Sequence, residues 1–288
     1  MPISKTALND PDFPRRLTYI SDPPEQLYRL GAPLNDLLAR PCVAVVGSRR
    51  VTPYGRQITL QIAGELAAQG ITIISGLALG VDGLAHQAAL EAGGLTIAVM
   101  PQHLGKLYPA TNARLGQRIL DQGGALVSEY DASAEFVYKT NFIARNRLIS
   151  GLADAVLITE AAIDSGSLHT AEFALDQGKE LMVVPGNVTS PMSRGANNLL
   201  RSGKAHFITH TRDVLNVLNI APQHTQTTII GRNPAEQTVI ELLVSGVSAG
   251  DELITMSGLS ASHFNQTLTM LEITGKVRAL GGNQWVLR

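Results

Sequence analysis

The sequence predicts an α/β protein with a mostly parallel sheet and a second, smaller C-terminal domain. From residue 41 to about 218, short apolar runs alternate with longer segments whose apolar residues have helical spacing. The apolar runs contain almost no polar residues, which indicates strands covered on both faces. Residues 234–288 show another pattern, with three short helical segments followed by two short strands. These observations predict two folding units of different class.

Strands are expected at 43–46, 71–75, 95–100, 125–129, 155–160, 180–185 and 206–209. Several of the helical segments between them end in glycine, which is typical just beyond a helix C-terminus. Repeated strand–helix–strand units of this length require right-handed crossovers and parallel pairing. We therefore expect an extended Rossmann-like sheet, whose strand order the pattern leaves open.

Four segments are expected along the chain. Residues 1–40 are rich in proline and predict an extended lead-in that packs on the main domain. Residues 41–218 form the Rossmann-like domain, and the polar, irregular stretch 219–233 is a linker. Residues 234–288 combine three short helices with a β-hairpin, which is the outline of a winged helix.

Composition limits the possible classes of protein. The 288 residues are 44% hydrophobic and 16% charged, which favours a buried core over disorder. Cys42 is the only cysteine, which excludes an internal disulfide and any multi-cysteine metal site. No stretch reaches 18 apolar residues and the N-terminus lacks a signal-like apolar segment. We expect a cytoplasmic protein with no membrane association, cofactor or metal.

The first strand ends in a turn with anion-binding chemistry. Gly47, Ser48 and Arg49 follow the strand and precede a helix, whose N-terminal N–H groups can hold an anion. Arg49 could add a bidentate phosphate contact, although a plain turn with a surface arginine stays an alternative. A dinucleotide site needs G-x-G-x-x-G here and an acid about 20 residues later. Neither is present, which argues against NAD.

A second group of candidate residues follows the fourth strand. Lys139, Phe142 and Arg145 lie in a segment without acidic residues, as expected where cations meet phosphates and a ring stacks on a base. Phe142 could instead pack in the core, and Lys139 could be an ordinary solvated side chain. Arg145 and Asn146 lie one turn into the helix, where either could instead hold the loop in shape.

After the fifth strand, Ser165, Gly166 and Ser167 open another helix and supply a second N-terminus to an anion. Glu160, at the end of that strand, could be a general base or a buried structural carboxylate. Both readings stay open from the sequence.

Charge is sorted locally although the net charge is −1. Residues 37–64, 136–153 and 181–212 contain cations and no acid. If these windows converge, a near-neutral protein presents a basic groove. Residues 234–288 instead have a net charge of −2, from five acidic and three basic residues, so a protein contact is favoured there over duplex DNA.

Several sequence motifs resemble those of the DNA-processing protein A (DprA/Smf) family in order and spacing: VAVVGSRRVTPYG, ISGLALGVDGLAHQAAL, LYPATNARL, RNRLISGLADAVLITEA and SGSLHTAEFALDQGKELMVVPGN. The match covers roughly 41–205, is most specific over 145–172, and extends to the winged helix. The resemblance implies a homodimer that binds single-stranded DNA, protects incoming DNA in natural transformation, and helps load the RecA recombinase. It implies no established catalytic activity. Its DNA pocket falls on Ser48, Arg49, Lys139, Phe142, Gly166 and Ser167.

Together, motif and resemblance predict nucleic-acid contacts at Gly47, Ser48, Arg49, Lys139, Phe142, Arg145, Asn146, Gly166 and Ser167. The chain departs from the family in three ways. Ile143 replaces the proline that often follows the phenylalanine, MPQHLGKLYP replaces a glycine-rich turn, and the long N-terminal helical domain of many members is expected to be absent.

The alternative function is a nucleotide-binding enzyme or sensor on the same scaffold, with Glu160 and Ser165 as a hydrolytic pair. That alternative predicts saturable binding or turnover of a mononucleotide. Single-stranded DNA binding predicts affinity that rises with oligonucleotide length and falls with salt. A duplex-reading transcription factor is disfavoured by the acidic C-terminal domain.

Overall fold

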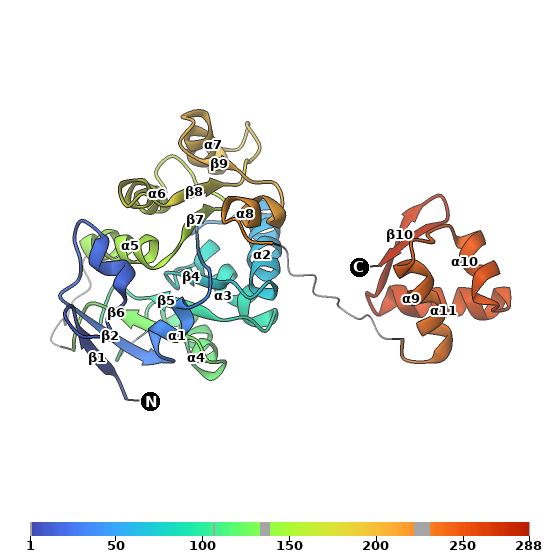
Figure 1. The fold of residues 1–288 in the computed structure, drawn as a ribbon. Helices are drawn as coiled ribbons and strands as arrows, with labels where there is room; N and C mark the ends of the chain where they lie inside the picture. Colours follow the sequence, from blue (N-terminus) through green and yellow to red (C-terminus); the bar gives the residue numbers. More distant parts are fainter. Residues whose placement is uncertain (1, 106, 133–138, 222–230, 288) are drawn as a thin grey trace. The chain divides into compact units, whose positions relative to one another are not determined.

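The computed structural model describes residues 2–105, 107–132, 139–221 and 231–287. The chain divides into two compact units, Met1–Gln223 and His224–Arg288, drawn separately in Figure 1. The expected linker 219–233 lies mostly within 222–230, outside the described residues. No helix in the described ranges is both long and apolar enough to cross a membrane.

The first unit is built on a sheet with the order β1-β2-β6-β5-β4-β3-β7-β8-β9, counting strands among the described residues. The strands are β1 Ser4–Ala7, β2 Gln26–Gly31, β3 Cys42–Val46, β4 Thr72–Ser75, β5 Thr96–Val99, β6 Ala125–Ser128, β7 Ala155–Ile158, β8 Glu180–Val183 and β9 His206–Phe207. From β6 to β9 every neighbouring pair is parallel, whereas β2 joins β6, and β1 joins β2, in antiparallel fashion. The predicted α/β class with a mostly parallel sheet is confirmed.

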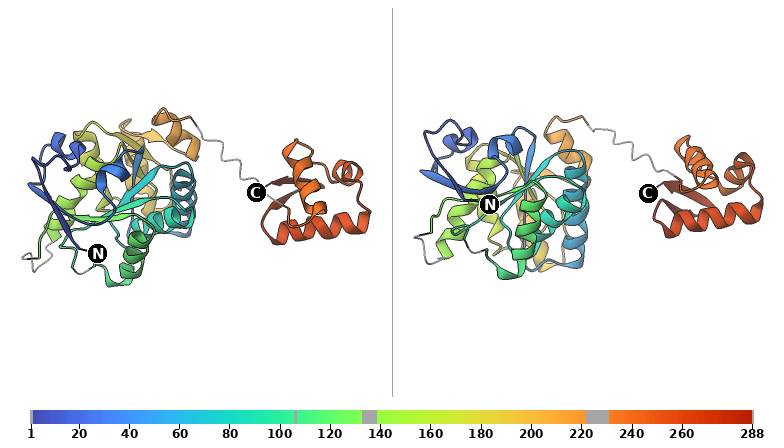
Figure 2. Two further views of the ribbon diagram at one scale, coloured as in Figure 1. Left: turned by 60° about the horizontal axis from the view of Figure 1, so that its bottom comes forward. Right: turned by 90° about the horizontal axis from the view of Figure 1, so that it is seen from below.

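Helices cover both faces of this sheet (Figure 2). They are α1 Leu34–Leu38, α2 Pro53–Ala68, α3 Val81–Glu91, α4 Ala113–Asp121, α5 Lys139–Leu152, α6 Ser167–Asp176, α7 Arg194–Arg201 and α8 Thr211–Val217, with short 3₁₀ turns η1 Arg15–Tyr19, η2 Ala110–Asn112 and η3 Pro191–Ser193. Along β3, Cys42, Ala44 and Val46 join the core under α5 and α6, whereas Val43 and Val45 join the core under α2 and α3. This alternation explains why the strand contains no polar residue.

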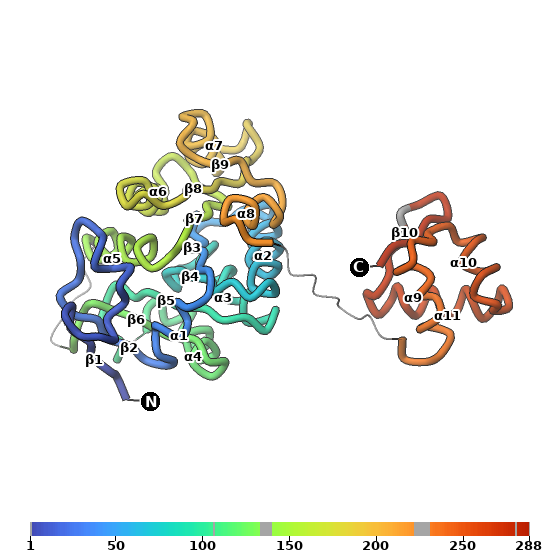
Figure 3. The backbone as a smooth tube through the Cα atoms, in the orientation of Figure 1, coloured from blue at the N-terminus to red at the C-terminus, as the bar shows by residue number. Residues whose placement is uncertain are grey.

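Residues 1–40 do more than lead into the domain. They contribute β1, β2 and α1, and the chain passes alongside α5 through η1 (Figure 3). The strands β1 and β2 were not predicted, because QLYRLG does not alternate cleanly between polar and apolar residues.

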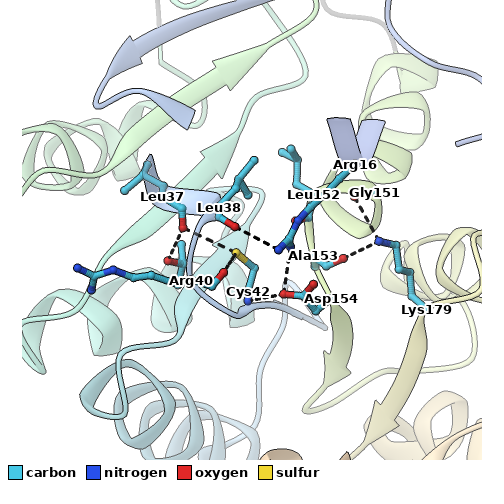
Figure 4. Close-up of polar contacts among 11 residues, drawn as sticks. Arg16, Leu37, Leu38, Arg40, Cys42, Gly151, Leu152, Ala153, Asp154 and Lys179 are labelled. Atoms are coloured by element: carbon cyan, nitrogen blue, oxygen red, sulfur yellow. Dashed lines mark hydrogen bonds and ion pairs between the residues drawn. The ribbon is translucent and has the colours of Figure 1, made fainter. Parts of the chain in front are cut away.

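Arg16 links η1 to the end of the sheet where the parallel strands β3 and β7 begin (Figure 4). Its guanidinium donates to the carbonyl oxygen of Leu152 at 2.9 Å and pairs with Asp154 at 3.0 Å. Asp154 also accepts the backbone N–H of Cys42 at 2.8 Å, and Lys179 donates to the carbonyl oxygen of Ala153 at 2.8 Å. These cations offset the partial negative charge at the C-terminus of α5.

The strand order places a switch point between β3 and β7. The chain runs outward from β3 through β4 and β5 to β6, then returns to the other side of β3 with β7. Val46 and Ile158, at the C-terminal ends of these two strands, are register partners. The loops after β3 and β7 therefore diverge from one point, where open α/β sheets form ligand-binding crevices.

The second unit consists of α9 Pro234–Val244, α10 Gly250–Ser257, α11 Ala261–Ile273 and the hairpin β10 Val277–Gly281 with β11 Gln284–Leu287. Its acidic count overstates its exposed negative charge. Glu236 is 3% exposed and pairs with Lys276 at 3.2 Å. Helix α11 has no lysine or arginine and exposes mainly uncharged polar side chains.

Candidate functional site

A cavity of about 790 Å³ lies at the C-terminal edge of the sheet, beside the switch point. Its volume is within the range of small-ligand sites. It is lined by Val46, Gly47, Ser48, Arg49, Arg50, Ala78, Asp82, Tyr108, Phe142, Ile143, Arg145, Asn146, Ile149, Ala162, Asp164, Ser165, Gly166, Ser167, His169, Thr170 and Met192. Eight of the nine predicted contact residues are in this lining.

The turn after β3 is held by backbone hydrogen bonds from both sides. The N–H of Ser48 donates to the carbonyl oxygen of Glu160 at 2.8 Å, and the N–H of Val81 donates to that of Ser48 at 3.1 Å. A Cβ atom at Gly47 would come within 2.6 Å of the same Glu160 oxygen. Glycine is therefore required where β3, β7 and α3 meet.

Glu160 has a structural role. Its side chain is 2% exposed and accepts hydrogen bonds from the N–H of Thr52 at 2.9 Å and from the Thr52 hydroxyl at 2.5 Å. Thr52 in turn caps the N-terminus of α2. The Ser165 hydroxyl lies 2.8 Å from that of Ser167, so Glu160 and Ser165 have separate hydrogen-bond partners. This favours the buried structural carboxylate over the hydrolytic pair.

Arg49 is exposed and lies within the cavity lining. Its guanidinium lies 5.1 Å from the centroid of the Phe142 ring, in a cation–π contact. In the part of the chain that the structure describes, Arg49 makes no ion pair with a carboxylate. Its N–H groups can therefore bind an incoming anion.

Arg145 and Asn146 hold the floor of the cavity together. Arg145 is 3% exposed, and its Nη1 donates to the carbonyl oxygen of Gly76 at 2.8 Å and to that of Val99. Asn146 donates to the carbonyl oxygen of Gly166 at 3.3 Å. Burial lowers the pKa of Arg145 to about 10, so its charge persists at neutral pH. Most contacts of Arg145 and Asn146 are thus structural, as expected if these residues hold the loops in shape.

Two buried ionisable groups lie close to Arg145, and one of them, Asp82, also lines the cavity. Asp82 accepts the N–H of Gly76 at 3.2 Å, and burial raises its pKa while the charge of Arg145 opposes the shift. His86 is fully buried, with Nδ1 2.7 Å from the hydroxyl of Thr96, which itself donates to a backbone carbonyl. Nδ1 must therefore carry the proton. Burial first, and Arg145 second, lower the pKa of His86 to about 3.

Gly166 is the N-cap of α6, and Ser165, Gly166 and Ser167 all line the cavity. The helix N-terminus therefore faces the same space as Arg49, and the positive end of its dipole favours an anion there. The turn after β3 and the helix start after β7, which were predicted separately, therefore meet at one cavity, whereas the N-terminus of α2 is not part of its lining.

The other two cations of the basic window 136–153, Lys139 and Arg147, differ in position. Lys139 is the first residue of α5, the helix whose first turn carries Phe142, but its side chain lies outside the described residues. Arg147 lies away from the cavity and pairs with Glu129 at 2.7 Å and Asp22 at 2.8 Å. The basic window 181–212 contributes only Met192 to the lining, so the three windows converge only in part.

Tyr108 is a lining residue that sequence reasoning missed. Its ring is T-shaped to that of Phe142, with centroids 5.8 Å apart. The only signal was an aromatic residue in the loop after β5, a loop that follows a strand end at the same edge of the sheet. Asp164, also missed, lies between Glu160 and the start of α6.

The cavity thus combines the N-terminus of α6, the exposed arginines Arg49 and Arg50, and two aromatic rings, which suits a ligand with both phosphates and bases. Among the residues whose placement is described, no group of three or more His, Cys, Asp or Glu could hold a metal ion.

Comparisons with known proteins agree with this geometry. The family profile of DNA recombination-mediator protein A matches residues 5–219, and that of the DprA winged helix domain matches 221–283. Protein Smf of Escherichia coli is 38% identical over 258 residues, covering 85% of this chain and 68% of that protein.

Two solved structures are also similar. The X-ray structure of DNA processing protein A from Streptococcus pneumoniae has a TM-score of 0.69 at 38% identity, covering 75% of this chain and 74% of that one. The protein of the same name from Helicobacter pylori, described for its single-stranded DNA binding mode, has a TM-score of 0.66 at 38% identity. It is matched over 75% of this chain and 95% of that one. With this fold, this cavity and these two matching domains, the chain belongs to the DNA recombination-mediator protein A family, with a DprA winged helix domain.

Proposed function

We propose that this chain binds single-stranded DNA in the cavity between the loops after β3 and β7. The observation that carries the proposal is Arg49, exposed and without a carboxylate partner among the described residues, at the same cavity as the N-terminus of α6 and two aromatic rings. The likeness to the Helicobacter pylori protein supports it.

Each proposed contact has a physical role. The turn at Gly47 and Ser48 lies against the phosphate, and the N–H groups at Gly166 and Ser167 donate hydrogen bonds to phosphate oxygens. Arg49 adds a charged, bidentate donor, and we assign Lys139 to the same strand backbone. These groups read no base edge, so binding should be independent of sequence. Arg145 and Asn146 complete the proposed set mainly by holding the walls in place.

We further propose the cellular role that the family implies. The chain would act as a homodimer in the cytoplasm, protect incoming single strands during natural transformation, and help load RecA onto them. No catalytic step is part of this proposal, and the engagement of Glu160 by Thr52 supports that view. Light scattering of the purified chain tests the homodimer, and RecA filament formation on single strands coated by the chain tests the loading of RecA.

The binding proposal is tested by titrating the full chain with oligothymidine of about 20 nucleotides, a duplex of equal length, and mononucleotides. Single-stranded DNA should bind most tightly, and the logarithm of its association constant should fall linearly with the logarithm of salt concentration. Saturable mononucleotide binding that matches or exceeds that of the oligonucleotide would instead favour a nucleotide sensor.

A further inference from the structure

We propose that Tyr108 is the surface on which a DNA base stacks, and that Phe142 is a positioning residue for Tyr108 and Arg49. The inference rests on the proposed function and assigns its base contact to a residue outside the predicted set. It follows from the neighbours and the exposure of the Phe142 and Tyr108 rings in the cavity.

Phe142 already has neighbours on its ring. The Arg49 guanidinium lies 5.1 Å from the ring centroid, over one face. The Tyr108 ring meets it at an interplanar angle of 69°, with the centroids 5.8 Å apart. Stacking needs an open face, so a base on the Arg49 side would have to displace a favourable cation–π contact.

Tyr108 presents more open surface. Tyr108 is 52% exposed, whereas Phe142, in the first turn of α5, is partly buried and less exposed. The loop carrying Tyr108 follows β5, at the same edge of the sheet as Arg49. A large aromatic residue exposed in a cavity is unusual for a purely structural side chain, and it is the arrangement that sequence-tolerant single-strand binding uses.

The surroundings of Tyr108 suit a base more than a phosphate. Ile143, which is 38% exposed, lies in the same cavity lining and adds apolar surface to it. Arg49 and the start of α6 line the same cavity. The lining therefore contains both charged and apolar groups, as a nucleotide unit with an anionic backbone and an apolar base face requires.

The test compares oligothymidine with an abasic oligonucleotide of the same length, whose phosphodiester backbone is intact. Tyr108→Ala should weaken oligothymidine binding roughly 5- to 150-fold and leave abasic binding nearly unchanged, because stacking is lost only where bases exist. Tyr108→Phe, which keeps the ring, should bind like the parent. Tyr19→Ala, which removes a tyrosine 77% exposed in η1 at the other edge of the sheet, is the matched control and should change neither.

A second variant gives a direct signal if the alanine variant is unstable. Tryptophan placed by Tyr108→Trp should lose fluorescence when oligothymidine binds and keep it with the abasic strand, beyond the background of Trp285 in the parent. Equal loss of affinity for both oligonucleotides in Tyr108→Ala, or unquenched fluorescence in Tyr108→Trp at saturation, would overturn the inference. A parent chain that binds neither strand would overturn the proposed function itself.

Discussion

Replacing Arg49 by alanine removes an exposed, positively charged side chain of the lining that lies over the Phe142 ring and has no carboxylate partner among the described residues. Arg50, which is also exposed in this lining, is left in place. It leaves the turn itself intact, because the Ser48 backbone bonds to Glu160 and Val81 do not involve the arginine side chain. The variant therefore tests the proposed phosphate contact without disturbing the fold.

The expected loss follows from two opposing contributions. A charge-assisted hydrogen bond contributes about 1.5–3 kcal/mol, with the lower part of that range suited to an exposed group. If DNA binding weakens the cation–π contact between Arg49 and Phe142, the parent chain loses about 0.5–1 kcal/mol, which reduces the net contribution of Arg49 to binding by that amount. The net loss of about 1 kcal/mol corresponds to roughly fivefold weaker binding, and the salt slope should fall by about 0.7.

The assay is fluorescence anisotropy with labelled oligothymidine at several salt concentrations, using circular dichroism to confirm folding. Arg49→Lys should keep the salt slope while binding more weakly, because lysine retains the charge but not the bidentate fork. Arg15→Ala removes an exposed arginine at the opposite edge of the sheet and serves as the control. Arg49→Ala binding with the affinity and slope of the parent would refute the assignment.

Three further outcomes are expected. The pKa of His86 in the folded chain, about 3, lies below its unfolded value, so the free energy of unfolding should decrease as the pH falls below about 6.5. The decrease should reach about 2–3 kcal/mol at pH 4.5, and urea unfolding of His86→Gln should lack this pH-dependent part. Burial raises the pKa of the Cys42 thiol to about 12, so it should resist alkylation at pH 8 until the chain unfolds, and rapid labelling of native protein would contradict its burial. Arg16→Ala should destabilise the chain by about 1–3 kcal/mol, and a double-mutant cycle with Asp154→Asn should show coupling; additive losses would mean that the pair contributes nothing.

The parallel strands from β3 to β7 were predictable because each is buried on both faces and is therefore mostly apolar. The antiparallel strands β1 and β2 were not, since a proline-rich context and an imperfect polar–apolar alternation remove that signal. The position of the cavity was predictable in part, because strand C-terminal ends share one edge. That β7 lies beside β3 required the strand order, which periodicity does not contain.

Within the candidate site, residue type alone could not separate binding from structure. Arg49 and Arg147 look alike in sequence, yet one faces the cavity and the other is paired with Glu129 and Asp22. Glu160 looked equally suited to catalysis or support until its partner Thr52 was visible. Tyr108 was missed because its loop has no periodic pattern, and only the fold brings it to Phe142.

The most direct test of the account is to map where a single strand lies on the full chain. Oligothymidine carrying photoreactive thymine analogues would be crosslinked to the protein, and the attached peptides identified by mass spectrometry. The account predicts crosslinks in the loops after β3, β5 and β7 and in the first turn of α5. Crosslinks confined to α11 and the β10–β11 hairpin, with none at that sheet edge, would contradict it.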